Sequence, residues 1–211
     1  MKIRKAEAKD LPFIIEAIIE SEKSGGDIFP YSAALGVSIS RFSQILMDVF
    51  DEEINDQPWC LEHWYIAESP DGSAAAGLSS WEEGKGGISS DMLKAQTLNY
   101  FLKNEWQESQ DNLKVLSSVT IARKTQYMQL EHLYTHPSHR GKGYMKNLIN
   151  GVINTFKNSN FEIQVLESNK NAVSLYEYIG FSVNERQCNE DIERLSLLSG
   201  SCKLQLLKNH G

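Results

Sequence analysis

The sequence has no long apolar run and few cysteines. No stretch of its 211 residues approaches the ~20 apolar residues needed to cross a membrane. The N-terminal segment MKIRKAEAKD is charged and lacks the apolar part of a signal peptide. The three cysteines, Cys60, Cys188 and Cys202, show no CxxC spacing. We therefore expect reduced thiols in a cytoplasmic protein, with no disulfide framework, no zinc site and no membrane partner.

Carboxylates are missing from one stretch of an otherwise acidic chain. The formal net charge is −7, yet no Asp or Glu occurs from His132 to Phe161. The same stretch carries the cations Arg140, Lys142, Lys146 and Lys157. A local cationic segment in an acidic protein favours a phosphate-bearing ligand over bulk nucleic-acid binding. Its histidines lack the cysteine or carboxylate partners of a metal site, so we expect no metal.

The same stretch has the pattern of a strand, a turn and a helix. Gln129–Thr135 predicts a strand, Ser138–Gly143 is a polar turn, and apolar residues from Tyr144 to Phe156 follow at helical spacing. Such a turn offers free backbone N–H groups and a positive helix end to an anion. Gly141 and Gly143 allow the backbone to approach that ligand closely. A tight turn among solvated charges is the alternative, because a GxG pattern alone is weak.

The rest of the pattern predicts a mixed α/β protein. Ser69–Gly72 is a strong turn signal and predicts a hairpin. The length fits one domain, without internal repeats, over residues 1–211. Residues 115–122 fit either a strand or a continued helix. We expect helices that begin near Asp10, at Ser40 and at Ser90 or Asp91, a short helix over 171–179, and further strands at 2–6, 64–68, 74–81, 161–166, 181–186 and 202–207.

Two segments resemble a known family. The turn SHRGKG, Ser138–Gly143, resembles the Q/R-x-x-G-x-G/A acyl-CoA pyrophosphate loop of the GNAT superfamily of N-acetyltransferases. The segment NKNAVSLYEYIGF, Asn169–Phe181, resembles the N-x-x-A-x-x-L-Y-x-x-x-G-F segment of the same family. The close match spans roughly residues 129–187, and both segments at this spacing are a specific signal. Ser138 departs from the Gln or Arg of the pattern, which weakens any phosphate contact from that side chain.

The resemblance implies a GNAT-like fold with a central mixed, mostly antiparallel sheet flanked by helices. It also implies an enzyme that transfers an acetyl group from acetyl-CoA to an amine by direct attack in a ternary complex. The partner we expect is a small-molecule or peptide amine, with no nucleic acid, and a homodimer stays open. Residues 82–127 are longer than a simple connection in this fold, and we expect them to form an insert near the acceptor site.

The resemblance also assigns roles to particular residues. Tyr176 matches the family's general-acid tyrosine, which would protonate the leaving thiolate; its alternative is a core aromatic. Asn169 matches a cofactor-contacting asparagine and could also cap the helix that follows. Further cofactor contacts are expected from the end of the central strand and from the turn, at Leu133, Tyr134, Thr135, His139, Arg140, Gly141, Lys142, Gly143 and Tyr144.

Two neighbouring residues on the central strand are candidates for the base that deprotonates the amine. Glu131 is the catalytic carboxylate that we predict, and His132 and a chain of waters are alternatives. Successive strand residues point to opposite faces, so we expect at most one of the two side chains to face the acceptor. A paired structural carboxylate and a core histidine are the corresponding structural interpretations.

Two other functions remain open at this point. A GNAT-like domain could bind acyl-CoA as a regulatory module without turnover, although the presence of Tyr176 and Asn169 argues against it. A dinucleotide-binding oxidoreductase would need G-x-G-x-x-G after the strand, and Lys146 stands where the third glycine belongs.

Overall fold

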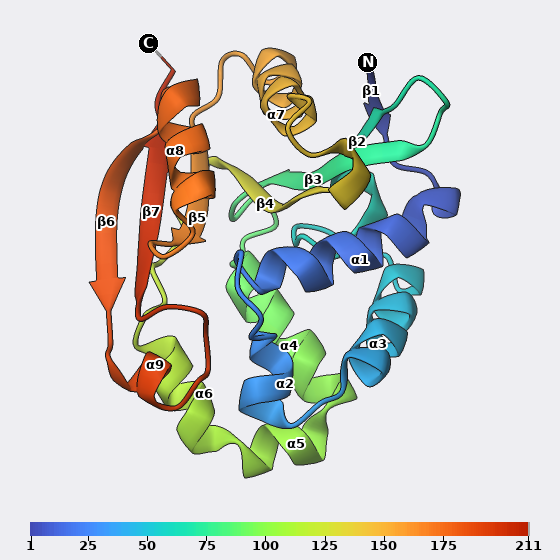
Figure 1. Ribbon diagram of the computed structural model, residues 1–211. Coiled ribbons are helices and arrows are strands. Elements are labelled where there is room, and N and C mark those ends of the chain that lie inside the picture. Colours follow the sequence, from blue (N-terminus) through green and yellow to red (C-terminus); the bar gives the residue numbers. More distant parts are fainter. Residues whose placement is uncertain (211) are drawn as a thin grey trace.

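The computed structural model describes residues 1–210, which form a seven-stranded sheet in the order β1-β2-β3-β4-β5-β7-β6 (Figure 1). β4 and β5 run parallel, and every other neighbouring pair is antiparallel. This arrangement confirms the predicted mixed, mostly antiparallel α/β fold. The strands are β1 (Lys2–Lys5), β2 (Trp64–Glu68), β3 (Ala74–Glu82), β4 (Met128–Thr135), β5 (Phe161–Leu166), β6 (Ser182–Cys188) and β7 (Cys202–Lys208).

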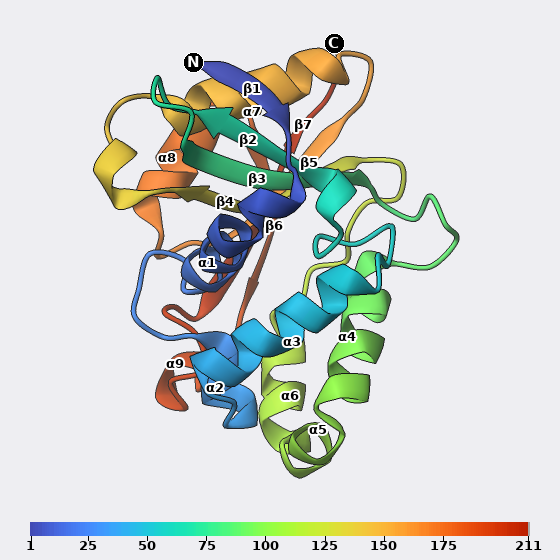
Figure 2. The same ribbon diagram turned by 90° about the vertical axis from the view of Figure 1, so that its right-hand side faces the viewer.

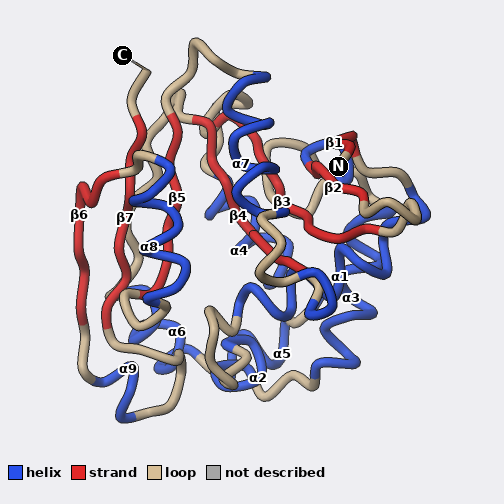
Figure 3. Tube along the Cα trace, turned by 45° about the horizontal axis from the view of Figure 1, so that its top comes forward, coloured by secondary structure: helices blue, strands red, loops and turns tan. Residues whose placement is uncertain are grey.

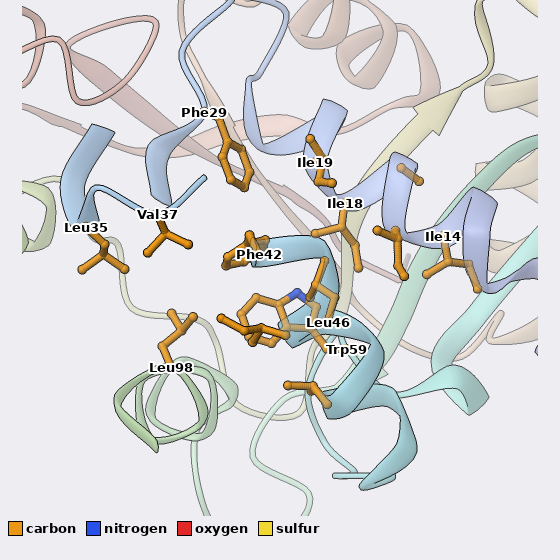
Figure 4. Close-up of a cluster of buried hydrophobic side chains, with 14 of the residues drawn as sticks. Ile14, Ile18, Ile19, Phe29, Leu35, Val37, Phe42, Leu46, Trp59 and Leu98 are labelled. Carbon is orange, nitrogen blue, oxygen red and sulfur yellow. The ribbon is translucent and has the colours of Figure 1, made fainter. Parts of the chain in front are cut away.

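Helices cover both faces of the sheet and enclose two apolar cores. On one face, α7 (Tyr144–Thr155) and α8 (Lys170–Ile179) bury residues such as Leu148 and Val152 against Leu130 and Ile163. On the other face, α1 (Leu11–Glu22) and α3 (Ile39–Asp51) pack with the remaining helices, which gather below the sheet in Figure 2. Figure 4 shows this second core, in which Ile14, Ile18, Phe42, Leu46 and Trp59 are fully buried. No helix within residues 1–210 is both long and apolar enough to cross a membrane.

The helix boundaries differ from the expected ones where capping side chains decide. Ser38, not Ser40, caps α3 by accepting a hydrogen bond from the backbone N–H of Arg41. Ser89 does the same for α4 (Ser90–Phe101) through the N–H of Met92. The short α2 (Pro30–Leu35) was not expected; it begins with a proline and ends at Gly36, which adopts a left-handed conformation.

The predicted insert, residues 82–127, begins at the last residue of β3 and then contains three helices and no further strand. After α4 the chain breaks at Leu102 and continues as α5 (Lys103–Glu108) and α6 (Gln110–Ser117). The helix expected to begin at Ser90 or Asp91 therefore ends at Phe101, and the open question over residues 115–122 resolves as a helix end followed by irregular chain. The remaining short helix is α9 (Asp191–Arg194).

One expectation about the cysteines is wrong. Cys188 and Cys202 form a disulfide across the antiparallel pair β6–β7, where the two residues are direct partners. The expectation of reduced thiols rested on their spacing along the chain, but strand pairing brings together cysteines 14 residues apart. Cys60 is free and buried.

Candidate active site

The site lies where β4 and β5 part. These parallel strands pair only from Met128 to Leu130 on β4, opposite Phe161 to Ile163 on β5. Beyond that point they diverge, as Figure 3 shows, and the edge of β4 that faces β5 keeps unpaired N–H and C=O groups. A cavity of about 810 Å³ occupies this opening and is lined by the ends of both strands, the turn before α7, the start of α8 and the loop after α1.

A β-bulge at His132 shapes one wall of this cavity. On β3, Ser79 pairs with Glu131 and Gly77 with Tyr134, so one residue of β3 lies opposite two residues of β4. His132 takes the extra position with a left-handed φ of 53°. As a result Glu131 and His132 both line the cavity on the same face of the sheet. The expectation that at most one of them faces the site is wrong, because the bulge interrupts the alternation of the strand.

The turn before α7 presents free backbone donors to the cavity. Gly141 and Gly143 have φ values of 74° and 78°, in the region that favours glycine. The N–H groups of residues 141–143 donate to no backbone carbonyl in the described chain. A Cβ on Gly141 would meet no atom within 4 Å, so the space beside the turn is open. These donors at a helix start, with Arg140 and Lys142 alongside, suit the phosphates of an acyl-CoA.

Helix α8 brings the two other motif residues to the same cavity. Asn169 caps α8, since its Oδ1 accepts the N–H of Ala172 at 3.2 Å, and its side chain also lies against the backbone of Gly25. Tyr176 is only 6% exposed, and burial raises the pKa of its hydroxyl above the usual value. The hydroxyl therefore stays protonated at neutral pH and can act as an acid.

A buried network of charges adjoins the bulge. Both oxygens of Glu131 are ion-paired, Oε1 with Lys94 at 3.1 Å and Oε2 with Arg123 at 2.7 Å. Burial would raise the pKa of Glu131, but the two cations outweigh it and hold the pKa well below its usual range. Lys94 also pairs with Glu22 at 3.2 Å, and Arg123 with Asp91 at 3.1 Å. Glu131 is thus a poor proton acceptor at neutral pH.

His132 differs from Glu131 in having a free nitrogen. The Ser21 hydroxyl donates its proton to the carbonyl of Ile18 at 3.0 Å and lies 3.1 Å from His132 Nδ1. With the Ser21 proton directed to Ile18, we assign the ring proton to Nδ1, which leaves a lone pair on Nε2. Nε2 is buried and has no hydrogen-bond partner among residues 1–210. Burial, the largest effect, lowers the pKa of His132 to about 4 despite the nearby carboxylates, so the ring is neutral at pH 7.

Glu22, Glu131 and His132 have ligand atoms within 4.8 Å of one another, close enough for a metal ion. The ammonium of Lys94 donates to both carboxylates, however, and Arg123 donates to Glu131 as well, so cations already occupy this cluster. The cluster therefore has the chemistry of an ion-pair network.

The cavity brings together nearly every residue predicted from the sequence. Its lining contains all of the predicted catalytic and cofactor-binding positions except Lys142, whose ammonium donates to the carbonyl of Ser138. Tyr134 contributes to the lining, but its hydroxyl points to Glu16 at 2.7 Å. The lining also contains Glu22, Arg123 and Lys203, which the sequence did not predict. They come from α1, an irregular segment and β7, and no local motif marks them.

Comparison with known proteins agrees with this geometry. Residues 102–181 match the model of the Acetyltransferase (GNAT) family. No curated protein matches the sequence.

Solved structures share the fold over nearly the whole chain. An N-acetyltransferase from Staphylococcus aureus Mu50 matches with a TM-score of 0.66 and 14% identity, over 99% of this chain and 100% of that one. A GNAT-family acetyltransferase from Streptococcus agalactiae matches with a TM-score of 0.54 and 13% identity, over 99% of this chain and 94% of that one. A spermidine N-acetyltransferase mutant from Vibrio cholerae matches with a TM-score of 0.56 and 15% identity, over 100% of this chain and 95% of that one. Residues 102–181, which contain both motifs, match the GNAT family, and the whole chain shares the fold of these acetyltransferases, so the chain is similar to the GNAT superfamily of N-acetyltransferases.

Proposed function

We propose that the protein transfers an acetyl group from acetyl-CoA to an amine acceptor by direct attack in a ternary complex. The observation that carries the proposal is the single cavity at the β4–β5 opening, which joins the turn, Asn169, Tyr176 and His132. Acyl transfer from acetyl-CoA to an amine requires backbone donors for the phosphates, an acid for the leaving thiolate and a base for the amine. The turn, Tyr176 and the neutral imidazole of His132 supply these groups around one cavity.

The donor would bind along the turn and the open strand edge. The free N–H groups of residues 141–143 and the start of α7 would hold the pyrophosphate, with Arg140 adding charge. The unpaired edge of β4 at Leu133–Thr135 would offer an N–H donor to the thioester carbonyl, whose oxygen becomes negative as the amine attacks. Asn169 would contact the donor from the start of α8.

The transfer itself needs two protons to move. The amine nitrogen bonds to the thioester carbon, and the carbon–sulfur bond breaks. The departing thiolate takes the proton of the Tyr176 hydroxyl, because a thiol with a pKa near ~8.5 leaves more easily when protonated. The amine attacks in its neutral form, after its ammonium proton has passed to solvent. The nitrogen then gives up a second proton to His132 Nε2, directly or through a water. Solvent takes this proton from His132 and restores the proton of Tyr176 by way of the cavity.

His132 suits the proton-accepting role better than Glu131. The nitrogen becomes far more acidic once it has attacked, so an imidazole of low pKa with a free lone pair can then accept its proton. Glu131, with both oxygens in ion pairs, would instead position Lys94 and Arg123 beside the site. This proposal changes the role that the sequence suggested for Glu131 and keeps the residue in the site.

Two-substrate kinetics test the proposal. Direct attack predicts intersecting lines when acetyl-CoA and amine concentrations are varied together, and no thiol release from acetyl-CoA alone. Parallel lines with a burst of thiol before amine is added would mean an acetylated enzyme and would refute direct attack. Cys60, the free cysteine of the described chain, is buried and does not line the cavity, which argues against such an intermediate. Tight acetyl-CoA binding without turnover of any amine would favour the regulatory-module alternative.

A further inference from the structure

A second cavity of about 520 Å³ adjoins the first one on the side of α2 and α4–α6. The two cavities share Glu22, Leu198 and Lys203 in their linings. The walls of the second cavity are mostly apolar. The predicted insert supplies Leu98, Trp106, Leu113 and Val119, and α2 supplies Tyr31 and Leu35. A ligand body placed here would meet aromatic and aliphatic side chains, while its reacting end would reach the first cavity past Glu22.

Glu22 supplies a negative group at the junction. Its Oε1 receives Lys94 at 3.2 Å and the Tyr31 hydroxyl at 3.4 Å, and its side chain is 19% exposed. Its other oxygen, Oε2, has no hydrogen-bond or ion-pair partner in the described part of the chain. An ammonium entering from the second cavity could therefore bind Oε2 without displacing Lys94.

Lys203 supplies a positive group whose ammonium has no hydrogen-bond or ion-pair partner among residues 1–210. It lies on β7, opposite Leu166 of β5, and lines both cavities. Loss of hydration lowers the pKa of its ammonium, with Arg123 adding repulsion, and no hydrogen bond to a described side chain offsets these effects. Glu22 is among the charges that act on it. A cation in such surroundings gains most from an anionic group on the ligand.

We propose that the acceptor is a free α-amino acid with a large apolar side chain. Its amine binds Glu22 and faces the thioester, its carboxylate binds Lys203, and its side chain fills the cavity between α2 and α4–α6. The two charged groups of an amino acid are one carbon apart, as binding at a single junction requires. A polyamine fits poorly, because its further ammonium groups would meet mostly apolar walls and Lys203, and Asp91, the other carboxylate of the lining, is already paired with Arg123. This inference rests on the proposed acetyl transfer.

Matched acceptor pairs test the inference. Phenylalanine, methionine and leucine are compared with phenethylamine, 3-(methylthio)propylamine and isoamylamine, which lack only the carboxylate, and with spermidine. Wild-type enzyme is expected to show a higher kcat/KM for each amino acid than for its amine. Lys203→Met keeps an unbranched side chain, one atom shorter, and removes its charge. It should lower kcat/KM for the amino acids by something like ~10- to 100-fold, the usual effect of a charge-assisted hydrogen bond, and leave the amines unchanged.

Lys103→Met is the control, because Lys103 is an exposed lysine on α5 that lines neither cavity. It should alter neither class of acceptor, and thermal melts should show both variants folded. Turnover of the amines or spermidine in preference to the amino acids overturns the inference and leaves acetyl transfer intact. An equal effect of Lys203→Met on both members of each pair also overturns it. Acetyl-CoA binding without turnover of any acceptor overturns both proposals.

Discussion

Burial of a neutral histidine beside the site predicts a pH-dependent loss of stability that one substitution removes. His132 is 4% exposed, and burial lowers its pKa to about 4, against ~6.5 in an unfolded chain. The unfolded state therefore binds more protons than the folded state between these values. The stability that His132 contributes is complete above pH ~6.5 and is lost as the pH falls toward 4.

The size of the effect follows from the two pKa values. Lowering the pH from 8 to 5 should cost about 2 kcal/mol in the free energy of unfolding through His132, and the full shift corresponds to about 3 kcal/mol. His132→Asn removes the titrating group and retains a residue that tolerates the left-handed backbone at this position. The variant loses the stacking against Trp64, so it should be less stable than wild type at every pH. Its free energy of unfolding should, however, lack the decrease toward low pH that His132 causes.

Urea unfolding of both proteins at pH 5, 6, 7 and 8 measures this slope. The stability gap between wild type and His132→Asn should narrow by about 2 kcal/mol from pH 8 to pH 5. His210→Asn, at an exposed histidine near the C-terminus, is the control and should track wild type throughout. A gap that stays constant over this range would show that His132 titrates alike in both states, and it would contradict the buried neutral imidazole.

Two further substitutions separate binding from structure. Gly141→Ala and Gly72→Ala both introduce a side chain at a left-handed φ, 74° and 84°, with no atom within 4 Å of the added Cβ. Each substitution should cost on the order of ~1 kcal/mol of stability. Only Gly141→Ala should weaken acetyl-CoA binding in calorimetric titration. Equal affinities of Gly141→Ala and wild type for acetyl-CoA would exclude the turn as the phosphate-binding site. Glu131→Gln leaves two buried cations without their shared partner, so urea unfolding should show a loss of about 3 kcal/mol; a silent change would mean that the ion pairs contribute nothing.

Local patterns predicted the parts of the site that one chain segment builds alone. The strand, the turn and α7 follow one another in sequence, and the periodicity of the apolar residues identifies them. The cap at Asn169 and the stop at Gly180 bound α8 in the same way. These features depend on capping, glycine conformation and helical spacing, which act over a few residues.

The rest depends on packing between distant segments. The bulge at His132 is set by its register with β3, so strand alternation alone misplaced its side chain relative to Glu131. The partners of Glu131 come from α4 and from the irregular segment before β4, and nothing in the sequence near Lys94 or Arg123 marks them. The disulfide and Lys203 likewise follow from the pairing of β7 with its neighbours.

The central claim is that Tyr176 protonates the departing thiolate. Tyr176→Phe removes the hydroxyl and keeps the ring that packs in the core beside Phe181. Tyr178→Phe is the matched control on the same helix, because Tyr178 is 71% exposed and does not line the cavity. Thermal melts should show that both variants are folded.

The decisive measurement is kcat for wild type, Tyr176→Phe and Tyr178→Phe with acetyl-CoA and with an acetyl donor whose thiol has a lower pKa. Tyr176→Phe should keep its affinity for acetyl-CoA and lose kcat by something like ~10²-fold. The loss should shrink with the more acidic thiol, which leaves without a proton, while Tyr178→Phe should match wild type with both donors. A folded Tyr176→Phe enzyme with wild-type kcat would contradict the account and remove the tyrosine from the mechanism.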